Sequence, residues 1–185
     1  MVQAKHIDIQ QGRKTLSSLL LCFLALLLSA CYKEEIPEVV ERVRVGDSLP
    51  RFELLMNNGL RLSWQDFQDK TVVLVFFSTQ CGDCRKELPV VESLWQANQG
   101  RPDLMVLAIS RGEGEEMVGP FWREMNLSLP YSAQNDRRIY ELFASSVVPR
   151  IYIANPEGTV IAAFDHSNMP NLQTLMQIVG TPRLQ

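Results

Sequence analysis

Residues 71–87 read TVVLVFFSTQCGDCRKE, and they are the strongest indication of the fold in the sequence. Thr71–Phe77 is a continuous apolar run rich in β-branched and aromatic residues, which is typical of a central strand buried on both faces. From Cys84 to Gln99 apolar residues recur on one helical stripe, and we expect Pro89 to kink that helix. A buried strand that passes directly into a helix predicts an α/β fold.

The rest of the chain supplies further elements of the same kind. Asn57-Asn58-Gly59 is a strong hairpin turn signal, and Asn155–Gly158 marks a second turn. Further strands are expected over 51–55, 60–62, 104–109, 150–154 and 159–164, and further helices over 120–125, 137–143 and 170–179. The pattern predicts a central mixed β-sheet flanked by helices on both faces.

Composition excludes some classes of function. The chain has 185 residues, of which 46% are hydrophobic, and a formal net charge of −3. This length fits one domain with extensions. Lysine and arginine are scattered rather than clustered, so the sequence predicts no binding to nucleic acid. We expect a monomer.

The first thirty residues differ in kind from the rest. Met1–Lys14 is basic, and Leu16–Ala30 is almost wholly apolar (LSSLLLCFLALLLSA). A run of this length falls short of the roughly 20 residues that a membrane-spanning helix needs. A basic start followed by a short apolar run and small residues predicts a secretory signal peptide over 1–30.

The end of the apolar run, Leu28-Ser29-Ala30-Cys31, resembles the lipobox of bacterial lipoproteins. The resemblance implies that Cys31 is acylated and becomes the new N-terminus, and that the domain is held at a membrane. Residues 31–45 then form the lipidated N-terminus and a charged tether, whose end could pair as a strand. The expected location is the periplasmic face of the outer membrane, with the cell surface as the alternative because of Lys33-Glu34-Glu35.

Cys81 and Cys84 are the cysteines that remain in the mature domain. Unpaired amides and the helix dipole make a helix N-terminus positive, so a thiolate at Cys81 is stabilised and its pKa is expected below the free value of about 8.5. Cys84, one turn deeper, can resolve a mixed disulfide formed at Cys81.

A lone CxxC motif is compatible with chemistry besides dithiol exchange. It could be half of a zinc site or a static local disulfide, but zinc needs about four ligands. The one histidine of the mature chain is His166, far downstream in a polar turn. A surface histidine is a simpler interpretation of His166 than a zinc ligand. Proline before a strand, as at Pro149, is by itself an ordinary feature.

Three stretches together resemble the TlpA/ResA-type branch of the thioredoxin-like family. They are GDSLPRFELLMNNGLRLSWQDF, KTVVLVFFSTQCGDCRKELPVVESL and VVPRIYIANPEGTVIAAF, which lie in the family's order between Gly46 and Phe164. The resemblance implies a thioredoxin-like domain over 46–185. It also implies that the disulfide Cys81–Cys84 carries out the redox chemistry and that no cofactor or metal is needed.

The resemblance also implies roles for residues outside the CxxC motif. Pro149 is expected to be cis and to pack against the two cysteines, and the Val148 backbone is expected to pair with the substrate. Glu87 matches an acid of this branch that transfers the Cys84 proton or tunes the thiols; the simpler interpretation is a helix-surface carboxylate.

Three residues depart from the family pattern. Gln80 stands where tryptophan is usual, which could open the substrate groove. Asp83 stands where proline is frequent, and its carboxylate should oppose a nearby thiolate. Arg150 stands where a small hydroxyl residue is common, and we expect it in the substrate groove with Val148 and Gln80. It could pair there with Asp83 or with an acidic partner, or lie exposed at the strand end.

The expected function is that of a thiol–disulfide oxidoreductase of the bacterial cell envelope, acting as a reductase. The resemblance implies an upstream membrane thiol reductant and oxidised envelope proteins as clients, with apocytochromes among the candidates. A second enzymatic hypothesis is a peroxiredoxin-like peroxidase, for which Ser78 fits but Leu74 replaces the required proline. Two hypotheses without catalysis are a Cu(I)-binding module, in which the two thiolates and His166 hold the metal, and a thioredoxin-fold module that serves only as a scaffold.

Overall fold

The structure, a computed structural model, describes residues 40–180. Five strands form one sheet in the order β5-β4-β3-β6-β7, with β3 at its centre. These strands are β3 (Thr71–Phe77), β4 (Leu104–Ser110), β5 (Tyr131–Ser132), β6 (Arg150–Ala154) and β7 (Val160–Asp165). Strand β3 is parallel to β4 and antiparallel to β6, so the sheet is mixed, as predicted.

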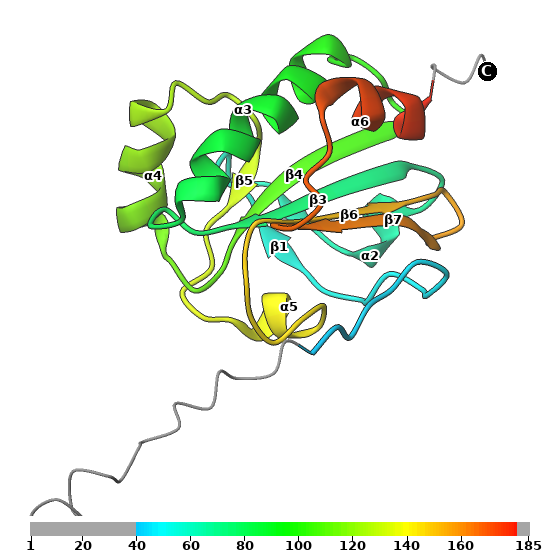
Figure 1. Ribbon diagram of the computed structural model, residues 1–185, viewed down its shortest axis with the longest axis horizontal. Helices are drawn as coiled ribbons and strands as arrows, with labels where there is room; N and C mark the ends of the chain where they lie inside the picture. The colour runs from blue at the N-terminus through cyan, green and yellow to red at the C-terminus, as the bar shows by residue number, and fades with distance from the viewer. Residues whose placement is uncertain (1–39, 181–185) are drawn as a thin grey trace, which may run out of the picture. The chain divides into compact units, whose positions relative to one another are not determined.

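The remaining elements surround this sheet (Figure 1). A two-stranded antiparallel hairpin, β1 (Leu54–Leu55) and β2 (Arg61–Leu62), closes at the predicted Asn57–Gly59 turn. The helices are α2 (Trp64–Phe67), α3 (Gly82–Ala97), α4 (Glu115–Glu124), α5 (Arg138–Glu141) and α6 (Leu172–Val179). Among residues 40–180, no helix is both long and apolar enough to cross a bilayer.

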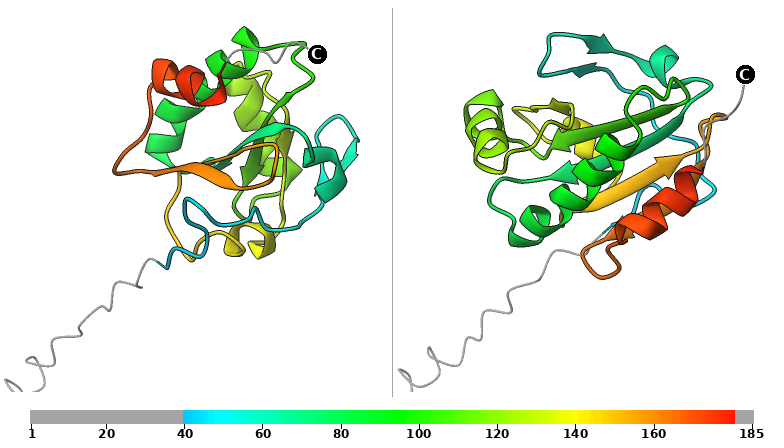
Figure 2. Two further views of the ribbon diagram at one scale, coloured as in Figure 1. Left: turned by 90° about the vertical axis from the view of Figure 1, so that its right-hand side faces the viewer. Right: turned by 90° about the horizontal axis from the view of Figure 1, so that it is seen from above.

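The side chains of β3 alternate between two hydrophobic cores. Val73, Val75 and Phe77 pack with α3, α4 and α6, whereas Val72, Leu74 and Phe76 pack on the other face with α2, α5 and the segment around Leu49 and Phe52. Successive residues of a strand point to opposite faces, so a strand covered on both sides must be apolar throughout. Figure 2 shows α3 and α6 together on one face of the sheet.

Several elements differ from the sequence-based expectation. Helix α4 begins at Glu115, five residues before the expected start, and it includes Pro120. Pro120 therefore does not start the helix, because burial of Val118, Phe121 and Trp122 outweighs the missing hydrogen bond of the proline. Helix α3 also contains a proline, Pro89; it runs from Gly82 to Ala97, where the sequence predicts a helix over 84–99. The short elements α2 and β5 have no counterpart in the prediction, because two to four residues carry too little periodicity to detect.

The segment that begins at Val40 runs beside the chain at 143–145. The Val40 carbonyl accepts a hydrogen bond from Ser145 N–H at 3.1 Å, and Glu41 forms an isolated antiparallel bridge with Ala144. The end of the predicted tether therefore pairs with the segment that precedes Pro149.

Candidate active site

The two cysteines lie where a buried strand meets a helix. Cys81 is the N-cap of α3, and its Sγ accepts a hydrogen bond from Cys84 N–H at 3.1 Å. The pair is disulfide-bonded with a Cα–Cα distance of 5.2 Å. Cys84 is fully buried and Cys81 is partly exposed, so an incoming disulfide can reach only Cys81.

The peptide bond before Pro149 is cis, as predicted, and Val148 lies beside Cys81. The Val148 carbonyl oxygen lies 3.4 Å from Sγ of Cys81. The register of the sheet explains this approach: Arg150 in β6 is paired with Phe76 in β3, so the residues just before β6 lie beside the residues just after β3. Two segments separated by 67 residues in the chain are thereby brought into contact.

Glu87 is buried rather than lying on the helix surface. It lies one turn beyond Cys84 on α3 and is 6% exposed. No residue within 40–180 gives its Oε1 a hydrogen-bond partner, and burial raises the pKa of the carboxyl to about 7. A carboxyl with a pKa near neutrality can both release and accept a proton at physiological pH, which suits acid–base chemistry.

Gln80 and Asp83 are exposed on either side of Cys81. The Asp83 carboxylate pairs with Lys86 Nζ at 2.7 Å. The hydrogen bond and charge of Lys86 lower the pKa of Asp83, and His166 makes a smaller contribution in the same direction. The His166 side chain is half-exposed, as expected for a surface histidine. Its effect on the pKa of Asp83 indicates that it lies near the start of α3.

The expected placement of Arg150 was wrong. Arg150 is 2% exposed, and both of its terminal nitrogens contact the Glu41 carboxylate at 2.7 Å, whereas Asp83 pairs with Lys86. The side chain lies beneath the Pro149 loop rather than in the substrate groove. It points inward because β6 alternates, and the hydroxyl of Tyr140 and the carboxylate of Glu41 satisfy it there.

The structure adds a residue that the sequence did not single out. Glu113 accepts hydrogen bonds from Ser78 Oγ at 2.6 Å and from Thr79 N–H at 2.7 Å. From the loop after β4, it thereby holds the link between β3 and Cys81 in place. A glutamate 35 residues away in a loop carries no periodic signal, so only the fold could identify it.

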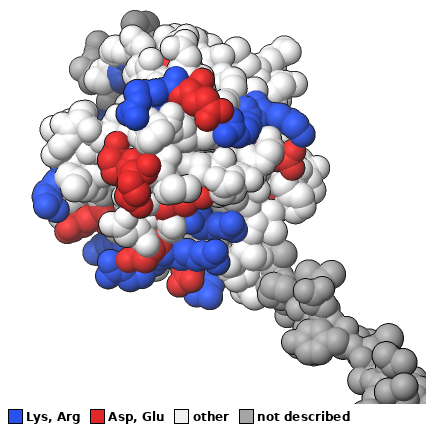
Figure 3. All heavy atoms as spheres, turned by 90° about the vertical axis from the view of Figure 1, so that its left-hand side faces the viewer, with Lys and Arg blue, Asp and Glu red and all other residues white. Residues whose placement is uncertain are grey.

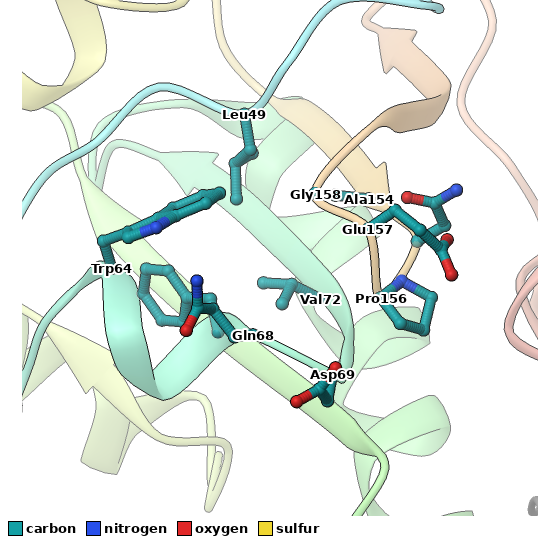
Figure 4. A pocket seen from close by; sticks show the side chains of 11 residues that line it. Leu49, Trp64, Gln68, Asp69, Val72, Ala154, Pro156, Glu157 and Gly158 are labelled. Carbon is teal, nitrogen blue, oxygen red and sulfur yellow. The ribbon is translucent and has the colours of Figure 1, made fainter.

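No group of three or more His, Cys, Asp or Glu side chains in the described part of the chain is arranged to hold a metal ion. A cavity of about 350 Å³ lies between Trp64, Val72 and Pro156 (Figure 4). Val72 is near the start of β3, whereas Cys81 follows its end, so this cavity is at the opposite end of the strand and is not part of the redox site.

The surface around the start of α3 carries both signs of charge. Figure 3, which faces the side where α4 and the start of α3 lie in Figure 1, shows acidic and basic side chains in small neighbouring groups. Arg85 pairs with Glu124 at 2.8 Å, and Lys86 with Asp83. Neither sign forms a continuous patch, so no single-sign field on this face would attract a strongly charged partner.

A cis proline beside a CxxC disulfide at a helix N-terminus, on a five-stranded mixed sheet, is the arrangement of a thioredoxin-like thiol–disulfide oxidoreductase. The sequence profile of the AhpC/TSA family matches residues 45–163, and the chain belongs to that family.

Individual relatives agree with this assignment. The thiol-disulfide oxidoreductase ResA of Bacillus subtilis is 29% identical over 123 residues, which cover 65% of this chain and 67% of that one. The thioredoxin domain of a thiol-disulfide oxidoreductase from Bacteroides vulgatus shares the fold with a TM-score of 0.61 and 21% identity, covering 75% of this chain and 99% of that one. A thiol:disulfide interchange protein from Chlorobium tepidum has a TM-score of 0.62 and 17% identity, covering 74% and 95%. The proposed lipid attachment site, Cys31, lies outside the described residues.

Proposed function

We propose that this chain is a protein-disulfide reductase of the bacterial cell envelope. The observation that carries the proposal is the pairing of a partly exposed Cys81 with a buried Cys84 beneath the Val148–Pro149 peptide. One sulfur is accessible to a substrate and the other is held in reserve, which is the arrangement that dithiol exchange requires.

The reaction starts from the reduced enzyme. The Cys81 thiolate attacks one sulfur of a substrate disulfide, the substrate S–S bond breaks, and one substrate thiolate leaves. The Cys84 thiolate then attacks Sγ of Cys81, forms the Cys81–Cys84 disulfide and releases the second substrate thiolate. Two electrons pass from the enzyme to the substrate, and a dithiol reductant at the membrane returns them.

Glu87 has the position and the pKa to handle the Cys84 proton. Cys84 is fully buried, so its proton cannot pass directly to solvent. Glu87 lies one turn further along α3; its buried Oε1 has no hydrogen-bond partner among the described residues, and its pKa is about 7. In its ionised form it accepts the proton when Cys84 becomes a nucleophile, and it is a catalytic residue in this proposal.

The substrate chain binds beside Cys81. The Val148 backbone provides the groups that pair with it, and the exposed Gln80 leaves the other side of the groove open. Main-chain pairing gives affinity with little dependence on side chains, which suits a reductase that serves several oxidised proteins.

The proposed anchor places this site near a membrane. Cys31 precedes Val40 by nine residues, which span roughly 30 Å at full extension. Val40 is hydrogen-bonded to Ser145, which lies in the same loop as the substrate-binding Val148. A lipidated Cys31 on the periplasmic face of the outer membrane would therefore limit clients to disulfides close to that surface, and oxidised apocytochromes or other envelope proteins are candidates.

Reduction of insulin by dithiothreitol tests the activity. The wild-type protein should accelerate the reaction, and Cys81→Ser should return it to the uncatalysed rate. Equal rates for the two proteins would refute the proposal. Hydrogen peroxide, supplied instead of insulin, tests the peroxidase hypothesis with the same two proteins, and incorporation of labelled palmitate into the wild type but not Cys31→Ser tests the anchor.

A further inference from the structure

A buried polar cluster lies directly beneath the loop that carries Pro149. Arg150 Nε is 3.3 Å from the Ser146 carbonyl oxygen and 3.2 Å from that of Val147. The hydroxyl of Tyr140 is within hydrogen-bond distance of the same two carbonyl oxygens. The dithiol exchange reaction uses neither side chain.

The loop held by this cluster has an unfavourable backbone conformation. Val147 has a φ of 71°, in the left-handed region that β-branched residues rarely adopt. Such a conformation is unfavourable and persists only where the surroundings impose it. The two donors on the Val147 carbonyl are the interactions that impose it here.

The orientation of that carbonyl determines the orientation of the next amide. Val148–Pro149 is the only cis peptide among residues 40–180, so the Val147–Val148 peptide is trans. In a planar trans peptide the C=O and N–H groups point in opposite directions. Because the Val147 carbonyl points into the cluster, the Val148 N–H must point away from it, while the Val148 carbonyl lies beside Cys81.

We propose that Arg150 and Tyr140 are positioning residues for substrate binding: they hold the Val147 carbonyl and so aim the Val148 backbone at the incoming polypeptide. The proposal rests on the proposed function, since it concerns the substrate of the same site. It assigns a role to the arginine that replaces the small hydroxyl residue expected at this position.

Glu41 provides the counter-charge that allows Arg150 to be buried beneath the loop. The Arg150 side chain is 3% exposed, and a buried guanidinium without a counter-charge would be strongly unfavourable. Glu41 contacts both terminal nitrogens at 2.7 Å, a two-pronged geometry that leaves Nε free to face the loop. Because Glu41 belongs to the segment paired with Ala144, the docked end of the tether completes the cluster.

The test compares a protein substrate with a small disulfide. Insulin can pair with the Val148 backbone, whereas hydroxyethyl disulfide has no peptide groups and needs only Cys81. In Tyr140→Phe, KM for insulin should rise between about twofold and tenfold, the effect of one lost hydrogen bond. In Arg150→Lys, which loses the planar fork, it should rise about tenfold or more. For both variants kcat with insulin and the rate with hydroxyethyl disulfide should change less than about twofold, because neither side chain contacts the reacting sulfurs.

Arg101 and Tyr131 provide matched controls. The Arg101 side chain is also only 7% exposed, pairs with Asp103 at 2.9 Å and donates to the Gly180 carbonyl at 2.7 Å, beyond the end of α3 opposite Cys81. Tyr131 donates to Glu115. Arg101→Lys and Tyr131→Phe should lower the melting temperature without changing KM for insulin.

Three results would overturn the proposal: unchanged KM in both cluster variants, equal losses with both substrates, or the same KM increase in the controls. An inactive wild-type protein would instead refute the proposed function.

Discussion

Sγ of Cys81 lies 3.4 Å from the carbonyl oxygen of Val148, although 67 residues separate them in the chain. The attacking atom and the backbone that receives the substrate are therefore in direct contact. A disulfide whose flanking chain pairs with Val148 is delivered to the exposed sulfur, while Cys84 stays buried behind it. Orientation of this kind reduces the entropy cost of the exchange reaction.

Cys84→Ala should trap substrates. With the resolving thiol removed, the mixed disulfide at Cys81 cannot be released by the enzyme, so covalent complexes accumulate. Non-reducing electrophoresis of envelope fractions should show new bands that disappear on addition of dithiothreitol. Cys81→Ala is the control, and bands of equal intensity in both variants would contradict the assigned order of attack.

Glu87→Gln should flatten the pH dependence of stability of the oxidised protein. The carboxyl has a pKa of about 7 in the folded state against 4.5 as its ordinary value. Between these values the folded state keeps a proton that the unfolded state has lost, so the free energy of unfolding of the wild type falls as pH rises through this window. The fall should be on the order of 3 kcal/mol and should end above about pH 7.

Urea denaturation at pH 5 and pH 8 measures this difference. Glu116→Gln, on an exposed residue of α4, serves as the control and should follow the wild type. The same loss of stability in Glu87→Gln as in the wild type would show that Glu87 does not carry the titration.

Asp83 and Lys86 should act in opposite directions on Cys81. Asp83→Asn removes a negative charge next to the thiolate, so alkylation of Cys81 should reach its half-maximal rate at lower pH. Lys86→Met leaves the Asp83 carboxylate without its 2.7 Å partner and should move the midpoint to higher pH. Both side chains are exposed, so both shifts should shrink in about 1 M salt, at a Debye length of about 3 Å. Absence of any shift in Asp83→Asn would eliminate this electrostatic role.

Glu113→Ala should destabilise the link between β3 and α3. It removes two hydrogen bonds from a carboxylate and leaves the N–H of the buried Thr79 without its acceptor. The expected loss in free energy of unfolding is about 1.5–3 kcal/mol. Thermal or urea unfolding measures it, and the exposed Glu116→Ala should stay within about 0.5 kcal/mol of the wild type. A loss as small as that of the control would mean that the contacts of Glu113 contribute little.

Most of the sheet could be predicted from the sequence. The bounds of β3 and β6 are as predicted, because a strand covered on both faces must be continuously apolar and β-branched residues favour it. The expected helix from Pro120 is too short, because the buried stripe that extends α4 back to Glu115 outweighs the proline as a boundary. The elements α2 and β5 lie outside the prediction, since they are fixed by the contacts they make rather than by a local pattern.

Some features of the candidate site could likewise be predicted from the sequence, and others could not. The position of Cys81 and Cys84 at the start of a helix after a buried strand could be predicted, because it follows from residues adjacent in the chain. Three features of the site required the folded structure: Arg150 is buried against Glu41 and Tyr140, Glu113 accepts a hydrogen bond from Ser78, and Glu87 is buried. Burial and partnership depend on which distant segments pack together, and a charged residue carries no local sign of the partner that compensates it.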